Sequence, residues 1–245
     1  CGVMSWLLHE EVTTKKSHSI SMALLESCVD TLEKAIDAYY SGANRLELCS
    51  ELALDGLSPS LELIESTARA VPLPIHVMIR LKNIEEKSVG YRYTTEDVVS
   101  MCEFVRSVDA LRLPNVVGFV FGCLTETNEL DEVNTAKLVE CIHFYDTCYS
   151  ITFHRAFDRI ADKVGAIEKL QRLHVTRILT SGTPADQATN NLNMLEKLVA
   201  TALEHDIILM PCGGVREHNA QDILSKTRAV EIHSSAAWKL FIAPS

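Results

Sequence analysis

Residues 116–121 read VVGFVF and residues 207–210 read IILM, two unbroken apolar runs rich in β-branched and aromatic side chains. A strand that is covered by protein on both faces has this composition, because neither face meets water and polar residues need not alternate with apolar ones. Such strands are typical of parallel sheets with helices packed on them. The two runs therefore predict an α/β protein with a parallel sheet.

Similar runs recur along the chain, each separated from the next by a segment long enough for a helix. The expected strands lie near 23–28, 44–49, 74–80, 115–121, 149–154, 176–180, 206–211 and 229–233. The first expected helix begins after Asp30 or Thr31 as N-cap and ends at Gly42, and others cover 61–70, 95–108, 132–141, 163–173, 191–204 and 217–225. Eight strand–helix units in 245 residues favour a single (β/α)8 barrel of the TIM type over an open sheet. No Gly-x-Gly-x-x-Gly turn follows the first strand to support a dinucleotide-binding fold.

The two ends of the chain depart from the repeating pattern. Residues 1–21 show no hydrophobic period, so we expect a disordered head or one that is not part of the fold, with the barrel domain spanning 22–245. Only 11 residues follow Ser234, and they include Pro244, so the last helix of the barrel is expected to be short or missing.

The charge and composition of the chain argue against several classes of binding partner. A net charge of −10 argues against nucleic acid and against an anionic membrane, since most of the surface repels phosphate. No apolar run approaches the roughly 18 residues that a membrane span needs. The eight cysteines contain no CxxC pair and no zinc-type spacing, which predicts free thiols in a reducing compartment, the cytoplasm.

Catalytic and binding residues of a barrel lie at the C-terminal ends of its strands. The first two expected strands each end in Glu-x-Cys, with Glu26 and Cys28 on the first and Glu47 and Cys49 on the second. The two-residue period of a strand places each Glu and its Cys on one face, so neighbouring strands would bring two thiols and two carboxylates together. Thiolates suit Cu(I), zinc or iron–sulfur, whereas carboxylates suit hard cations or acid–base chemistry. Burial of the cysteines as small apolar side chains remains an alternative.

A second group of polar residues ends the other strands and competes with the thiols. The catalytic candidates are Glu47, Arg80, His154 and Asp158, and the anion-binding candidates are Arg155, Gly213, Gly214, Ser234 and Ser235. Loops after strands 7 and 8 of a barrel often bind phosphate through backbone N–H groups, which predicts a small phosphorylated or carboxylated substrate. His154 would be the general acid or base, Glu47 its carboxylate counterpart and Asp158 an orienting group. The alternatives are structural: an Arg80–Glu47 ion pair at the rim, a hydrogen-bonded core histidine, and glycines needed for a tight turn.

Several linked strings resemble the CutC copper-homeostasis family. They are MALLE at 22–26, GANRLELC at 42–49, LSPSL at 57–61, ITFHRAFD at 151–158, RILTSG at 177–182 and EIHSSA at 231–236. The resemblance implies a TIM-type barrel in the cytosol that self-associates as a dimer or tetramer and binds Cu(I) through Cys28 and Cys49. Two regions depart from the family pattern: only Arg80 is kept in the loop after the third strand, and the chain ends soon after Trp238. We therefore expect a Cu(I)-binding barrel, with a barrel enzyme acting on a small anionic metabolite as the alternative and a structural oligomer third.

Overall fold

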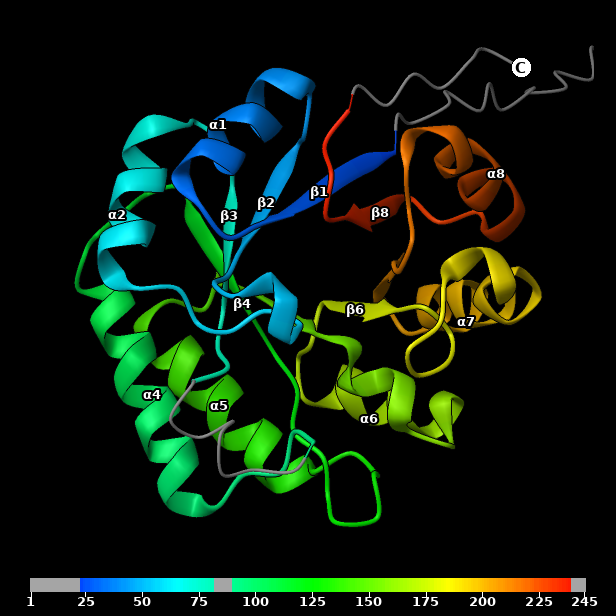
Figure 1. Ribbon diagram of the computed structural model, residues 1–245. Helices are drawn as coiled ribbons and strands as arrows, with labels where there is room; N and C mark the ends of the chain where they lie inside the picture. The colour runs from blue at the N-terminus through cyan, green and yellow to red at the C-terminus, as the bar shows by residue number, and fades with distance from the viewer. Residues whose placement is uncertain (1–22, 82–89, 239–245) are drawn as a thin grey trace, which may run out of the picture.

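The computed structural model describes residues 23–81 and 90–238. Eight parallel strands form one sheet in the order β7-β6-β5-β4-β3-β2-β1-β8. Their bounds are β1 Leu24–Val29, β2 Arg45–Leu48, β3 Ile75–Met78, β4 Val116–Phe121, β5 Ser150–Phe153, β6 Arg177–Thr180, β7 Ile208–Pro211 and β8 Glu231–Ser234. The end strands β7 and β8 lie beside each other, so the sheet curls into a nearly closed barrel (Figure 1). The predicted barrel is confirmed.

Seven helices surround the barrel in the described part of the chain (Figure 1). They are α1 Leu32–Ser41, α2 Leu61–Ala70, α4 Thr95–Asp109, α5 Glu132–Tyr145, α6 Lys163–Arg172, α7 Leu192–Glu204 and α8 Glu217–Thr227. Local sequence explains their ends. The Thr31 hydroxyl caps α1 by accepting a hydrogen bond from the Lys34 N–H, and Gly42 ends it at a φ of 97°, where a residue with a Cβ is strained.

The two faces of each strand have different surroundings. Phe119 and Phe121 of β4 pack in the main apolar core with helix side chains, whereas Val120 belongs to a small cluster with Cys28, Cys49 and Met78. On β1, β2, β3 and β8 the alternate positions carry charged groups that are nevertheless buried. The interior of the barrel is thus polar on one side, while the layer between sheet and helices is apolar.

Three expectations concern the ends of the chain and the third loop. Within the described residues β8 is followed by a loop to Trp238 and no helix. The expected head at 1–21, residues 82–89 of the third loop and the last residues 239–245 lie outside the described residues. No helix of the described ranges is both long and apolar enough to cross a membrane.

Candidate functional site

Strands β1 and β2 pair in a register that sets Cys28 opposite Glu47. The Cys28 thiol donates to Glu47 Oε1 at 3.2 Å, and its Sγ lies 3.6 Å from the Sγ of Cys49. All three side chains are buried. The structure thus brings both predicted metal-binding thiols and one predicted carboxylate together, as the Glu-x-Cys pattern indicated.

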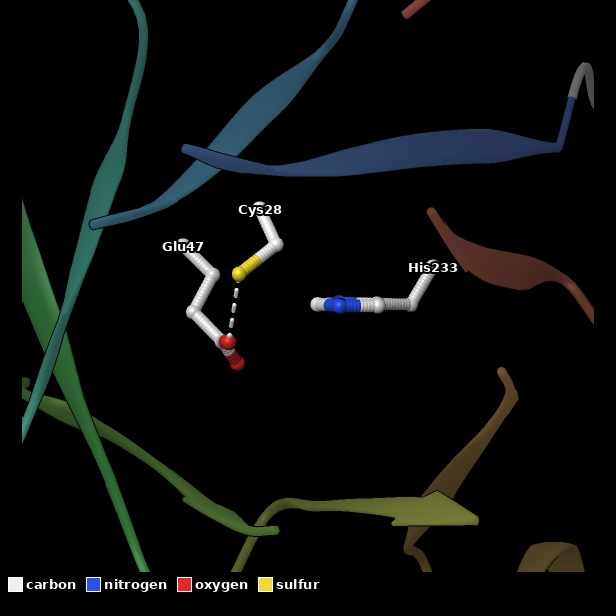
Figure 2. Close-up of side chains that lie close together, drawn as sticks. All are labelled: Cys28, Glu47 and His233. Atoms are coloured by element: carbon white, nitrogen blue, oxygen red, sulfur yellow. Dashed lines mark hydrogen bonds between the residues drawn. The ribbon is translucent and has the colours of Figure 1, made fainter. Parts of the chain in front are cut away.

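The third strand of this site is β8, which pairs with β1 on its other side. Figure 2 shows the His233 ring pointing from β8 toward Cys28 and Glu47. One sulfur, one carboxylate oxygen and one ring nitrogen of Cys28, Glu47 and His233 lie within 4.8 Å of one another, close enough to share a metal ion. A third sulfur side chain, Met78 of β3, packs in the same small cluster as the two cysteines.

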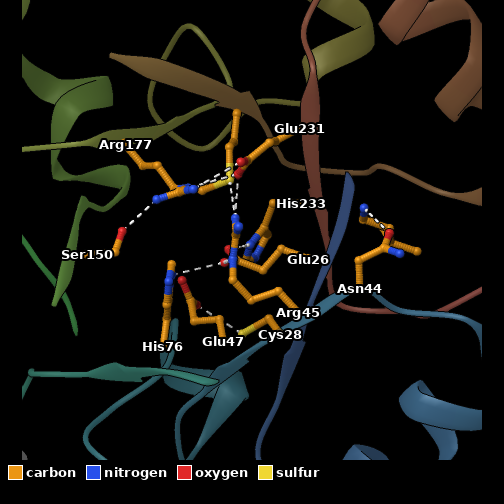
Figure 3. Close-up of polar contacts among 12 residues, drawn as sticks. Glu26, Cys28, Asn44, Arg45, Glu47, His76, Ser150, Arg177, Glu231 and His233 are labelled. Carbon is orange, nitrogen blue, oxygen red and sulfur yellow. Dashed lines mark hydrogen bonds and ion pairs between the residues drawn. The ribbon is translucent and has the colours of Figure 1, made fainter. Parts of the chain in front are cut away.

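A network of buried charges lies next to these groups inside the barrel (Figure 3). Arg45 on β2 pairs with Glu26 at 2.5 Å and with Glu231 at 2.5 Å. His233 Nδ1 lies 2.8 Å from Glu26 Oε1, and Arg177 makes a two-pronged contact with Glu231 at 2.9 and 3.1 Å. Each carboxylate therefore meets at least one cation, which is the condition for burying charge at tolerable cost.

This network shifts the pKa of the groups around Cys28. The hydrogen bond with Cys49, burial and the charge of Glu47 raise the pKa of the Cys28 thiol well above its usual range. Burial raises the pKa of Glu47 as well. Burial opposes the charged form of His233, but the carboxylates of Glu47 and Glu26 outweigh it and raise the pKa of His233. The raised pKa values favour the protonated forms of Cys28, Glu47 and His233, the groups that could contact a metal ion.

The donor set fits a soft cation. Thiolate and thioether sulfurs favour Cu(I) and zinc, and imidazole suits copper and zinc, whereas calcium and magnesium need several oxygens. Two metal–sulfur bonds of about 2.3 Å span up to roughly 4.6 Å, so sulfurs 3.6 Å apart can share one ion. Glu47 Oε2 is buried without a hydrogen-bond partner, which leaves it available to a ligand.

A cavity of about 420 Å³ opens above the thiols at the C-terminal mouth of the barrel. Its walls include Cys28, Glu47 and His233 together with most of the second predicted group of residues: His154, Arg155, Asp158, Gly213, Gly214, Ser234 and Ser235. Three arginines, Arg155, Arg159 and Arg216, line it together with three acids, Glu47, Asp55 and Asp158. The charged side chains of the cavity are therefore balanced, and the arginines are the groups that a small anion could contact.

The structure places Asp158, the expected orienting group, against Arg155. Its carboxylate accepts hydrogen bonds from Thr180, from Ser181 and, at 3.1 Å, from Arg155 Nε. These contacts make Asp158 an orienting group for Arg155, whose Nη2 also reaches Ser181 Oγ at 2.9 Å. The guanidinium of Arg155 is thus held at the cavity wall before any ligand arrives.

His154 is buried in that wall. Its Nδ1 accepts a hydrogen bond from the Ala156 N–H at 3.2 Å, and its Nε2 has no hydrogen-bond partner. Burial, reinforced by Arg80 and Arg155, lowers the pKa of His154 to about 3. At neutral pH the ring is therefore neutral, and because Nδ1 accepts a hydrogen bond its single proton lies on Nε2, which can donate a hydrogen bond to a ligand.

Arg80 and Ser234 are tied to the protein itself. Arg80 Nη1 donates to the carbonyls of Leu54 and Gly56 at 2.8 and 3.0 Å, and its guanidinium lies over the Tyr91 ring. The Ser234 hydroxyl donates to the Val215 carbonyl at 2.8 Å. Both residues shape the loops of the mouth.

The paired glycines at 213 and 214 have φ values of 82° and 68°. A Cβ at Gly213 would lie 2.7 Å from the Asp186 carbonyl oxygen, so the turn requires glycine for space as well as for conformation. Ser235 is exposed on the cavity wall. Cys123 stays away from the mouth, because it belongs to the main apolar core outside the barrel.

Five residues of the charge network were missing from the predicted site: Arg45, His76, Arg177, Glu231 and His233. His76 belongs to the network because its Nδ1 lies 3.4 Å from Glu26 Oε2. The sequence held a signal for three of the five. Arg45 precedes Glu47 by two residues, and Glu231 and His233 precede Ser235 by four and two, so strand alternation puts each on the same face as a predicted residue. His76 and Arg177 follow from no such neighbour among the predicted residues.

Comparisons with known proteins agree with this fold. The model of the CutC family matches residues 23–238. A human protein named copper homeostasis protein cutC homolog is 33% identical over 237 residues, covering 96% of this chain and 81% of its own. A CutC family protein from Aliivibrio fischeri is 35% identical over 211 residues, covering 86% and 81% of the two chains.

Solved structures give the same result. The crystal structure of a copper homeostasis protein CutC from Streptococcus agalactiae superposes with a TM-score of 0.78 at 27% identity and covers 88% of this chain and 99% of that one. A deoxyribose phosphate aldolase from Aeropyrum pernix shares the barrel with a TM-score of 0.64 but only 12% identity, a likeness of fold alone.

Proposed function

The chain belongs to the CutC family, and on that premise we propose that it serves copper homeostasis by binding Cu(I) through the thiolates of Cys28 and Cys49. The observation that carries the proposal is the pair of buried sulfurs 3.6 Å apart at the mouth of the barrel. Names of relatives such as the human copper homeostasis protein cutC homolog support copper as the cargo.

The neighbouring residues have distinct roles in this proposal. A thiol must lose its proton to become a metal ligand. Glu47, which already accepts the Cys28 S–H, is the nearest group to receive that proton. Glu26 holds the His233 ring in place beside the two thiols through Nδ1. Arg45 in turn holds Glu26, so the charge network fixes the geometry of the thiols.

Competition against a chromophoric Cu(I) chelator under reducing, anaerobic conditions tests the proposal. We expect the double variant C28S/C49S to lose affinity by more than about a hundredfold, because changes behind the metal ligands already cost about 10- to 100-fold. The matched control is C102S/C141S, which removes two thiols outside the barrel and should bind Cu(I) as the natural protein does. Unchanged affinity in C28S/C49S would contradict the proposal.

A second candidate function is an enzyme that acts on a small phosphorylated or carboxylated metabolite. The observation that favours it is the arginine-lined cavity, in which Arg155 is oriented by Asp158 and His154 Nε2 is unpartnered. NMR titration with inorganic phosphate should shift the amide signals of Gly213, Gly214 and Ser235, and R155Q should weaken the effect. No shift at millimolar phosphate would argue against this function.

We further expect the protein to work in the cytoplasm as a homo-oligomer. The seven cysteines of the described residues are all free thiols, which a reducing compartment preserves. Self-association as a dimer or tetramer is an expectation from the family resemblance, and light scattering during size-exclusion chromatography measures it.

A further inference from the structure

A second pair of cysteines lies on the outside of the barrel. Cys102 on α4 and Cys141 on α5 belong to two helices that pack side by side (Figure 1). Both side chains are only partly buried, and both line a groove of about 460 Å³ between the two helices. This groove is separate from the cavity at the mouth, and the two share no lining residue.

The two cysteines contact each other. The Cys141 thiol donates a hydrogen bond to the Cys102 carbonyl oxygen at 3.8 Å. Interaction with Cys141 lowers the pKa of the Cys102 thiol, and interaction with Cys102 raises the pKa of the Cys141 thiol. One sulfur is thus favoured as a thiolate and the other as a thiol.

The groove around them suits a reactive thiolate. Arg106 and Lys137 line it together with a single acid, Glu103, so its charged groups are net positive. Partial exposure beside cations is the environment in which cysteines react with oxidants, whereas fully buried cysteines in apolar surroundings are inert. A third thiol in the region, Cys123, is fully buried, and burial raises its pKa.

We propose that Cys102 and Cys141 form a peroxide-sensitive dithiol site that closes into a reversible disulfide linking α4 to α5. The Cys102 thiolate attacks one peroxide oxygen, the O–O bond breaks, and the leaving hydroxide takes up a proton to become water. Cys102 is then a sulfenic acid. The Cys141 sulfur attacks that sulfur, the S–S bond forms, and the hydroxyl leaves with the Cys141 proton as a second water. Two electrons pass from the thiols to the peroxide, and a dithiol reductant reverses the change.

The test is peroxide treatment of the full chain followed by non-reducing peptide mapping with mass spectrometry. We expect a linked Cys102–Cys141 peptide that disappears after dithiothreitol. In C141S the sulfenic acid cannot be resolved, so dimedone should label Cys102, whereas C102S should give neither the linked peptide nor that label.

Cys148, an exposed thiol in the loop after α5, is the internal control for the oxidant. If Cys148 is oxidised while Cys102 and Cys141 stay reduced, the proposal is wrong. A link from Cys102 to Cys123 or Cys148 in place of Cys141 would also overturn it. The linked peptide should form equally in C28S/C49S, which shows that this site does not depend on the thiols of the mouth.

Discussion

Two pairs of cysteines lie on opposite sides of the barrel wall. The inner pair, Cys28 and Cys49, is buried within the barrel beside carboxylates and imidazoles, whereas the outer pair, Cys102 and Cys141, lies in a half-exposed groove between two helices. The surroundings give the same side chain different chemistry. Inside, the hydrogen bond with Cys49, burial and the charge of Glu47 raise the pKa of the Cys28 thiol. Outside, interaction with Cys141 lowers the pKa of the Cys102 thiol, which is partly exposed to solvent.

The largest expected effect is a loss of folding stability when a buried charge beside the inner cysteine pair is removed. Arg45→Ala removes the cation that Glu26 and Glu231 share and leaves buried carboxylates short of a partner. We expect the free energy of unfolding to fall by about 3–5 kcal/mol, measured by urea denaturation.

The matched control is Arg106→Ala in the outer groove, which should change stability by less than about 0.5 kcal/mol. If Arg45→Ala and Arg106→Ala lowered the free energy of unfolding equally, the buried charge network would not be what stabilises the inner region.

Oxidation of the outer pair is expected to have the next largest effect. A disulfide there closes a loop of 39 residues, and the chain-entropy model gives up to about 4 kcal/mol of stabilisation for that length. The midpoint of thermal unfolding should therefore rise by several degrees after peroxide treatment, as differential scanning calorimetry would record. C141S should show no rise, and a rise in that variant would assign the effect to another oxidised residue.

A difference in the pH dependence of alkylation sharpens the comparison further. Only thiolates react, so the raised pKa of Cys28 delays its reaction to higher pH, while the lowered pKa of Cys102 allows reaction nearer to neutrality. Iodoacetamide labelling at pH 7.5, followed by mass spectrometry, should modify Cys102 at least about tenfold faster than Cys28, since each pKa unit changes the thiolate fraction about tenfold. The gap should narrow as the pH rises. Faster labelling of Cys28 than of Cys102 would contradict the lower pKa that we assign to Cys102.

The smallest effect concerns the third sulfur beside the inner pair. Met78→Leu keeps the volume of the side chain and should cost less than about 1.5 kcal/mol of stability. If two thiolates carry Cu(I) binding, affinity should fall by no more than about tenfold in chelator competition, a difference of about 1.4 kcal/mol. A much larger fall would make Met78 a full ligand and would change the donor set that we propose.

Much of this architecture follows from short-range sequence patterns. Apolar runs such as 116–121 indicate strands covered on both faces, and a cap at Thr31 with a glycine at Gly42 marks the limits of a helix; the structure confirms both. The Glu-x-Cys repeats placed each acid and thiol on one face, and the adjacency of β1 and β2 brought them together. Each inference needs only the period of the element or the pairing of consecutive strands.

Barrel closure made the contacts that sequence patterns did not predict. Glu26 and His233 are 207 positions apart and meet only because β8 pairs with β1, and Arg45 reaches Glu231 across the same junction. Asp158 was expected as an orienting group, and the end of β6 with the residue after it supplies Thr180 and Ser181, which hold its carboxylate against Arg155. Cys102 and Cys141 lie 39 positions apart on two different helices, and only the packing of α4 on α5 makes them a pair. The period of a strand or helix determines which face a side chain occupies, but the partner on that face depends on which distant element packs there.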